Sequence, residues 1–175
     1  MYKGWKVQRW ETPVSDARSL SMVSLVDDGK LTVILQDTRD PARRRFRFTF
    51  TICPVYRNIL EEFRRELWKE IKGQTEARSW TLTIPESQWI AYFSEAEPLL
   101  EEYYPGLTHY MICTEDDVVE ILSSQPPQIT EIEPATEGDK VPGKSTVYIY
   151  PEDKDKVDKL VNEVMEANDL RPDEV

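Results

Sequence analysis

One long stretch of this sequence has no positively charged side chain. Residues 79–139 contain neither lysine nor arginine, although the chain of 175 residues has 22 of these bases against 33 acids. The formal net charge of −11 therefore comes entirely from this stretch. Its acids are Glu86, Glu95, Glu97, Glu101, Glu102, Glu115, Asp116, Asp117, Glu120, Glu131, Glu133, Glu137 and Asp139. Because nucleic-acid phosphates repel an acidic surface, we expect no direct binding to DNA or RNA.

An acidic surface can instead attract a basic protein, and this is the kind of partner that the charge favours. A toxin, a nuclease or another effector with a basic surface fits this description. The alternative interpretation is that the negative charge only keeps the protein soluble.

Histidine and cysteine are scarce, which argues against the commonest catalytic and metal sites. The one histidine, His109, precedes Cys113 by four residues, and on a strand this spacing separates them by about 13 Å. Such a pair cannot exchange a proton directly, and Cys53 could reach His109 only through tertiary folding. The spacing of a zinc site is absent. Glu115-Asp116-Asp117 and Asp153-x-Asp155 lack the glycine and the terminal glutamate of a calcium loop. We therefore expect no catalytic residue, no metal and no cofactor.

Glycine and long apolar runs are also scarce. The six glycines form neither a phosphate-binding loop nor a dinucleotide fingerprint. No segment approaches the roughly 18 apolar residues that a membrane span requires. The first residues lack the apolar region of a secretory signal, and two isolated cysteines do not form a disulfide framework. The sequence thus predicts a non-enzymatic, cytoplasmic protein.

Alternating apolar residues predict an antiparallel meander in the first half of the chain. Asp27-Asp28-Gly29 has the composition of a tight hairpin turn. Phe46, Phe48 and Phe50 alternate with polar residues, which is typical of a strand with one buried face. The expected strands are residues 4–10, 19–26, 30–36 and 43–52.

A long amphipathic helix is predicted next, over residues 55–72. Its apolar positions recur at the helical spacing, and we expect this helix to cover the meander sheet. Pro54 suits its first turn and Gly73 suits the position just past its end. The predicted apolar stripe consists of Tyr56, Ile59, Leu60, Phe63, Leu67 and Ile71.

The second half predicts a short strand, a second helix over residues 86–97, an acidic and aromatic loop over 99–106, and two strands. The strands are residues 79–84, 107–114 and 118–122. Together these patterns indicate an α+β fold with a mainly antiparallel sheet. We expect one domain over residues 1–122. A proline-rich linker follows over 123–144, with at most an edge strand at 128–132. Residues 145–175 are expected to form a C-terminal strand–helix appendage, which is either separate or docked on the domain.

Tyrosines stand among acids in the segment EPLLEEYYPGLTHY, and this composition is typical of a protein-binding surface. Aromatic rings supply rigid anchors for desolvated contacts, and carboxylates accept arginine and lysine. The alternative is that the tyrosines cap the core with their hydroxyl groups in water. The predicted partner-binding residues are Glu95, Glu97, Glu101, Glu102, Tyr103, Tyr104, Tyr110, Glu115, Asp116 and Asp117.

Two other classes of function remain open at this point. One is a small-ligand-binding or enzymatic domain with an aromatic pocket between sheet and helix, lined by Trp80, Trp89, Tyr92 and His109. The other is a structural or assembly protein, which a concentration-dependent mass in solution would reveal.

The segments SQWIAYFSEAEP and LTHYMICTEDDVVEIL resemble those of small bacterial α+β proteins that act as immunity partners of toxins, or whose role is uncharacterised. The resemblance covers about residues 44–122 and rests on the pattern of the segments. It implies a cytoplasmic protein that binds and blocks a cognate toxin or effector. It assigns no individual functional residue, and the C-terminal residues fall outside it.

Overall fold

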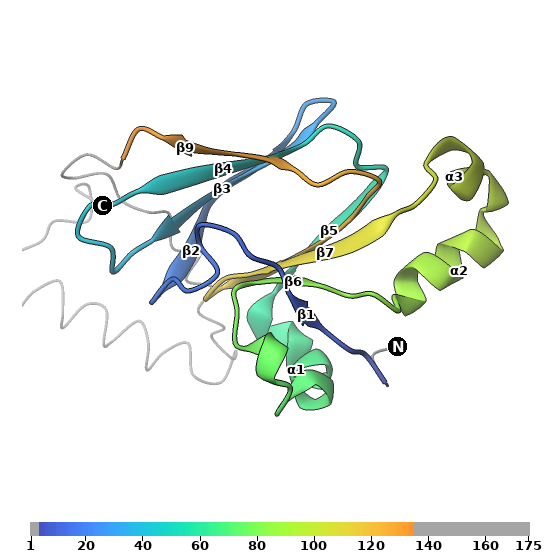
Figure 1. The fold of residues 1–175 in the computed structure, drawn as a ribbon, viewed down its shortest axis with the longest axis horizontal. Coiled ribbons are helices and arrows are strands. Elements are labelled where there is room, and N and C mark those ends of the chain that lie inside the picture. Colours follow the sequence, from blue (N-terminus) through green and yellow to red (C-terminus); the bar gives the residue numbers. More distant parts are fainter. Residues whose placement is uncertain (1–3, 135–175) are drawn as a thin grey trace, which may run out of the picture. The chain divides into compact units, whose positions relative to one another are not determined.

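The computed structural model describes residues 4–134, which form two antiparallel sheets and a few short helices (Figure 1). The first sheet has the strand order β1-β6-β7-β8-β5, and the second has the order β2-β3-β4-β9. Two antiparallel sheets with a few helices fit the α+β class, but the predicted arrangement of mainly one sheet packed against one long amphipathic helix is not found in the described residues. Among the described residues, no helix is both long enough and apolar enough to cross a membrane.

The elements have short, well-defined bounds. The strands are β1 (Gln8–Arg9), β2 (Leu20–Asp27), β3 (Leu31–Asp37), β4 (Arg45–Phe50), β5 (Val55–Leu60), β6 (Thr81–Thr83), β7 (Thr108–Cys113), β8 (Asp117–Ser123) and β9 (Gln128–Ile132). The α-helices are α1 (Arg65–Ile71), α2 (Gln88–Ala96) and α3 (Pro98–Tyr103), and single 3-10 turns occupy Glu61–Arg64 and Thr75–Ala77.

The predicted meander is the second sheet, in which β2, β3 and β4 pair consecutively. Gly29 lies in the turn between β2 and β3 with φ +97°, a conformation that glycine adopts without strain. Phe46, Phe48 and Phe50 all point inward and are buried, as their alternation predicts.

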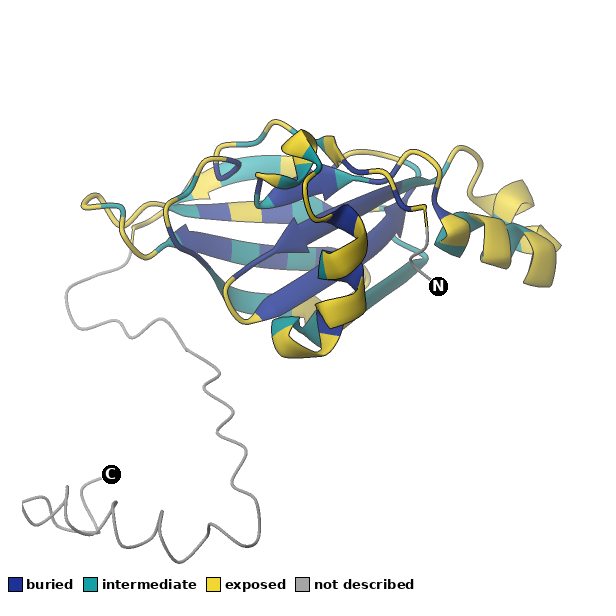
Figure 2. Cartoon of the chain, turned by 90° about the horizontal axis from the view of Figure 1, so that it is seen from below, coloured by how far each residue is buried: buried dark blue, intermediate teal, exposed yellow. Residues whose placement is uncertain are grey.

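The main core lies between the two sheets. Phe48 and Leu35 of the second sheet meet Tyr110 and Ile121 of the first sheet in one hydrophobic cluster. A second cluster lies on the opposite face of the first sheet, where Leu67 and Ile71 of α1 cover Met111. The first sheet is thus buried on both faces, which explains the nearly continuous burial along β7 and β8 (Figure 2).

One two-stranded ribbon passes through both sheets. β4 pairs with β9 and continues into β5, which pairs with β8. The register is the same in both halves. Thr49 pairs with Gln128 in the first half, and Val55 pairs with Leu122 in the second, so each strand advances by six residues between the two pairs. The ribbon bends between these pairs, where it leaves one sheet and enters the other.

The predicted helix over residues 55–72 is wrong in its first half. Residues Val55–Leu60 form β5, because β8 offers a complete ladder of backbone partners to a segment rich in β-branched and aromatic residues. Only residues 65–71 form α1, and this helix covers the first sheet instead of the meander. The expected apolar stripe is also broken: Phe63 is 60% exposed, whereas Arg64 is buried.

Further downstream, two predicted irregular segments contain regular structure. The loop predicted over residues 99–106 begins with α3, and the linker predicted from residue 123 contains β9 at the position expected for an edge strand. The sheet therefore extends past residue 122, the boundary predicted for the domain. The predicted appendage over residues 145–175 lies outside the described residues.

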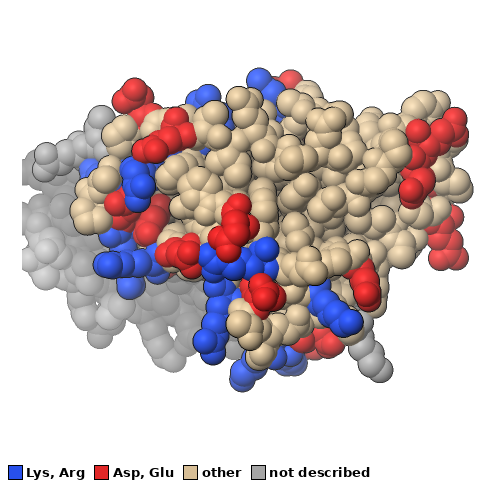
Figure 3. Space-filling view, viewed as in Figure 1, with Lys and Arg blue, Asp and Glu red and all other residues tan. Residues whose placement is uncertain are grey.

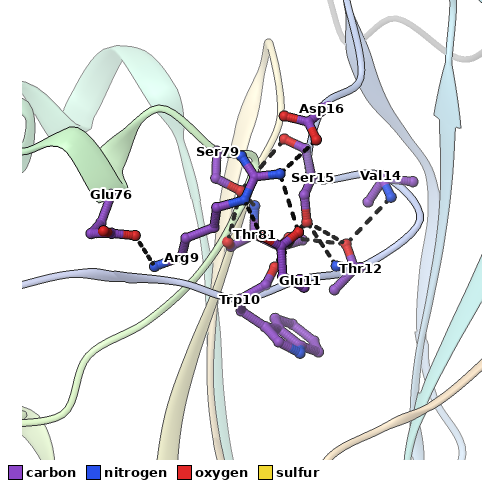
Figure 4. A network of polar contacts seen from close by, with 10 residues as sticks. All are labelled: Arg9, Trp10, Glu11, Thr12, Val14, Ser15, Asp16, Glu76, Ser79 and Thr81. Carbon is purple, nitrogen blue, oxygen red and sulfur yellow. Dashed lines mark hydrogen bonds and ion pairs between the residues drawn. The ribbon is translucent and has the colours of Figure 1, made fainter.

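A compact hydroxyl network ties the segment after β1 to β6 (Figure 4). Thr81 donates a hydrogen bond of 2.7 Å to the carbonyl of Trp10, and its Oγ1 lies 2.9 Å from both Thr12 Oγ1 and Ser15 Oγ. On the outside, Arg9 binds Asp16 at 2.6 Å. Because β1 has only two residues, these side-chain bonds supply much of its attachment to the sheet.

Replacing Thr81 by valine is expected to lower the free energy of unfolding by about 1–3 kcal/mol, since three hydroxyl-bonded partners lose one bond each in a buried site. Urea unfolding of the purified protein measures this change. The matched control is Thr83→Val on the same strand, where the side chain is only half-buried and takes no part in this network, and we expect a change within about 0.5 kcal/mol. Equal effects of the two substitutions would contradict the role of the network.

Candidate protein-interaction site

Helices α2 and α3, residues Gln88–Tyr103, form a two-helix arm in which no side chain is fully buried. The arm extends from the body of the two sheets and is almost entirely exposed (Figure 1, Figure 2). Within α2, the ring of Phe93 contacts those of Trp89 and Tyr92, with centroids 6.0 Å and 5.6 Å apart. The arm therefore presents most of its surface to the surroundings.

Large apolar side chains are exposed on this arm. Tyr92 is 64% exposed, Leu99 60% and Tyr103 71%, and Tyr104, which follows directly, is 37% exposed. These side chains do not contribute to either hydrophobic cluster of the protein. Exposed apolar groups gathered on one projection are a recognised mark of an interaction site.

The acids of the arm lie beside these apolar side chains. Glu95, Glu97, Glu101 and Glu102 are all exposed, and the arm contains no lysine or arginine. Figure 3 shows acidic side chains without basic ones at the arm's end of this face. Because no base of the arm itself can neutralise them, these carboxylates give the arm a local negative potential.

The root of the arm is fixed to the first sheet through Ser87 and His109. Ser87 Oγ accepts a hydrogen bond of 3.1 Å from the backbone N–H of Ile90 and so caps α2. The same oxygen lies 2.8 Å from Nδ1 of His109 on β7. His109 is completely buried, with the rings of Trp5 and Trp89 at centroid distances of 5.4 Å and 5.2 Å.

Behind His109 lies the buried carboxylate of Glu120 on β8. Arg57 Nε donates to it at 2.6 Å and Arg57 Nη2 at 3.0 Å, and Arg64 Nη2 forms a further short contact. The guanidinium of Arg57 also stacks over Trp89 at 4.3 Å from the ring centroid. Arg57 therefore connects the buried carboxylate to the first turn of the arm.

We call the cluster of Arg57, Arg64, Ser87, His109 and Glu120 the anchor of the arm. The burial and the neighbouring charges set the ionisation states of Glu120 and His109 in it. Burial alone would raise the pKa of Glu120, but the contacts with His109 and Arg57 and the charge of Arg64 outweigh it and lower the pKa to about 2. Burial lowers the pKa of His109, and the nearby arginines add to this effect, although Glu120 opposes it. The side chain of Glu120 is thus ionised, and His109 is neutral at pH 7.

We assign the proton of the neutral His109 ring to the side of Glu120. Since Ser87 Oγ accepts the Ile90 N–H, its own proton is available for Nδ1, which leaves Nε2 protonated. Nε2 lies 3.4 Å from Glu120 Oε1, too far for a normal hydrogen bond, so the contact is electrostatic.

Ser87, His109 and Glu120 are arranged like the three members of a hydrolytic triad, but their setting favours a structural role. All three are buried, Ser87 Oγ already caps a helix, and Glu120 is neutralised by two arginines. None of the three lines the hollows beside Trp80, Tyr104, Arg47 or Gln74. In the same part of the chain, no group of histidine, cysteine and acidic side chains is arranged to hold a metal ion.

The structure divides the partner-binding residues predicted from the sequence. Tyr110 lies in the core between the sheets and cannot form part of a surface. Asp117 is buried and accepts a hydrogen bond of 2.9 Å from Asn58 Nδ2. Glu115 and Asp116 are exposed, but they lie at the far end of β7, about 20 Å from the arm at the rise of a strand. The other predicted residues, from Glu95 to Tyr104, lie together on the arm or directly after it.

The four residues of the alternative aromatic pocket do not line one cavity. Trp89 and His109 are in contact inside the anchor, whereas Tyr92 is exposed on the outer surface of the arm. Trp80 lies elsewhere and donates a hydrogen bond of 2.6 Å to the carbonyl of Ala17. It lines a separate hollow of ≈ 400 Å³ with Trp68.

The sequence interpretation missed the residues that hold the arm in place, namely Arg57, Arg64, Ser87 and Glu120. One signal was present: Glu120 interrupts the apolar run VVEIL, and a lone acid within a buried strand requires a positive partner. The identity of that partner depends on the pairing of β5 with β8, which the sequence pattern did not reveal.

Comparison of the chain with protein-family models, with curated proteins and with solved structures gave no match.

Proposed function

We propose that this protein is a non-enzymatic binding module that recognises a basic protein through its arm, and that it inhibits this partner as immunity proteins inhibit toxins or nucleases. The observation that carries the proposal is the composition of the arm's surface: exposed Tyr92, Leu99 and Tyr103 stand beside four carboxylates, with no base among them.

The energetics of the exposed side chains support a binding role. Burying one large apolar side chain stabilises a complex by about 1.5–3 kcal/mol, and a partner that covers the arm would gain this free energy. Tyrosine is enriched among the side chains that dominate binding energy at interfaces. The surrounding carboxylates would attract a basic partner and orient it during the encounter.

The anchor supports the same role by fixing the arm before binding. A helix of nine residues such as α2 is only marginally stable alone, and α3 is shorter still. The cap from Ser87 and the contacts of Trp89 with His109 and Arg57 hold the first turn of α2 in one orientation. A pre-organised arm loses less conformational entropy when it binds.

Reversing the charge of the arm should weaken capture of the partner. We expect the triple variant Glu97→Lys, Glu101→Lys and Glu102→Lys to lower the affinity at least about tenfold, or 1.4 kcal/mol. The partner would first be isolated from the native host with the unmodified full chain and identified by mass spectrometry. Calorimetry with the purified partner then measures the affinity of each variant.

A matched triple variant, Glu62→Lys, Glu131→Lys and Glu133→Lys, changes the net charge equally at exposed positions outside the arm. It should retain nearly the affinity of the unmodified protein at physiological salt. Equal losses in the two variants would show that only the net charge matters, and unchanged affinity in both would contradict the proposal. Circular dichroism checks that both variants remain folded.

A further inference from the structure

A hollow of ≈ 510 Å³ lies where the end of the arm meets the bend of the ribbon. It is bordered by four segments of the chain: the β2–β3 turn, the β4–β5 bend, the residues after α3 and the residues after β8. Its walls include Gly29, Thr51, Cys53, Tyr103, Tyr104 and Gln125. The hollow therefore adjoins the exposed surface to which we assign partner binding.

Residues 51–54 of the bend line this hollow. The ladder between the two strands of the ribbon is interrupted from Thr49–Gln128 to Val55–Leu122, and residues 51–54 and 124–127 belong to no strand ladder. Ser123 Oγ lies 2.6 Å from the carbonyl oxygens of both Ile52 and Gln125, and its single proton can be donated to either of them. Carbonyl oxygens retain a second lone pair, so they can still accept a donor from outside.

The surroundings of the hollow are acidic and aromatic. None of its lining residues is basic, and two of them, Tyr103 and Tyr104, are aromatic. Asp27 and Asp28 precede Gly29 on the β2–β3 turn, and Glu101 and Glu102 precede Tyr103, against the single base Lys30. Burial and the charge of Asp27 raise the pKa of Cys53 to about 11, so its thiol stays neutral and adds no charge.

From these features we infer that the hollow receives an arginine side chain of the basic partner, whose guanidinium group stacks on Tyr104 and donates to the carbonyl oxygens of the bend. This inference deepens the proposed function and rests on it. Arginine fits better than lysine, because its planar group stacks on aromatic rings and presents several donors in one plane. Lysine has a compact, strongly hydrated charge that the rings would contact less well.

The test uses the full chain and a capped Gly-Arg-Gly peptide, followed by amide chemical shifts in nuclear magnetic resonance spectra. We expect saturable shifts at the amides of Thr51, Cys53 and Gln125. The matching lysine peptide should bind at least about threefold more weakly, and a citrulline peptide, which lacks the charge, should cause no comparable shifts.

Two substitutions of Tyr104 distinguish a loss of stacking on its ring from a loss of folding. Tyr104→Phe keeps the ring and should bind the arginine peptide like the unmodified protein, whereas Tyr104→Leu should weaken it at least about threefold. Tyr92→Ala, on the arm and outside the hollow, serves as the control and should have no effect.

Equal binding of the arginine and citrulline peptides, or shifts restricted to the arm, would overturn this inference. That failure can be distinguished from a failure of the proposed function, because the peptide experiment does not involve the partner. If the peptide leaves the hollow unaffected while charge reversal on the arm still weakens partner binding, the arginine site is wrong and the binding role of the arm stands.

Discussion

Replacing Glu120 by glutamine should lower the free energy of unfolding by about 3–5 kcal/mol, the largest effect that we expect from a single substitution. The side chain is fully buried and its carboxylate meets Arg57 and Arg64. Glutamine has nearly the same shape but no charge, so the guanidinium groups of Arg57 and of the buried Arg64 lose their ion pairs with this side chain. The decrease in the free energy of unfolding therefore measures mainly the contribution of the ion pairs, because the substitution changes the packing little.

Urea unfolding at pH 7 measures this loss, and Glu131→Gln on β9 is the control. Glu131 is exposed, and its replacement should change the free energy of unfolding by no more than about 0.5 kcal/mol. Glu120→Gln should also loosen the arm, since Arg57 stacks on Trp89 while it binds Glu120. A loss below about 1 kcal/mol would show that the network contributes little to stability.

Acidification should destabilise the protein in two separate steps. The pKa of Glu120 is lowered in the folded state to about 2 from an ordinary value of 4.5, so its contribution is present above pH 4.5 and is lost as the pH falls toward 2. A shift of this size corresponds to about 3 kcal/mol. The pKa of His109 is also lowered, so the folded state resists its protonation, and stability falls once the pH drops below 6.5.

Urea unfolding at a series of pH values from 8 to 3 resolves the two steps. The variant His109→Gln cannot be protonated at this position and should lose the step that begins near pH 6.5, while the step below pH 4.5 remains. The groups that face His109 are Ser87 on its arm side and Glu120, Arg57 and Arg64 on the other side. A pH profile that is identical in the variant would exclude His109 as the source of the first step.

The strands of the meander were predictable because their information is local. Alternation in β4 places every second side chain on one face, and the Asp-Asp-Gly turn joins β2 to β3 without help from distant residues. The same local reasoning failed at residues 55–60. That segment fits a helical stripe and a strand equally well by pattern, and the availability of β8 as a partner decided between them.

The candidate site was predictable to a similar extent. The acids and tyrosines of the arm could be read from composition, because exposed side chains need no partner within the fold. Tyr110 has the same residue type as Tyr103, yet it lies in the core, because it belongs to the face of β7 that packs against the second sheet. The anchor joins residues 57, 64, 87, 109 and 120, and no spacing along the chain relates them.

By itself the sequence determined the antiparallel meander, the position of α2 and the concentration of negative charge in one stretch, since periodicity and charge are properties of neighbouring residues. The tertiary structure alone decided that the stretch divides into an exposed arm, a distant turn and a buried carboxylate. The physical reason is that a buried charged group requires opposite charges close to it, and these come from residues distant in the sequence. Only the pairing of β5, β7 and β8 brings those charges to Glu120.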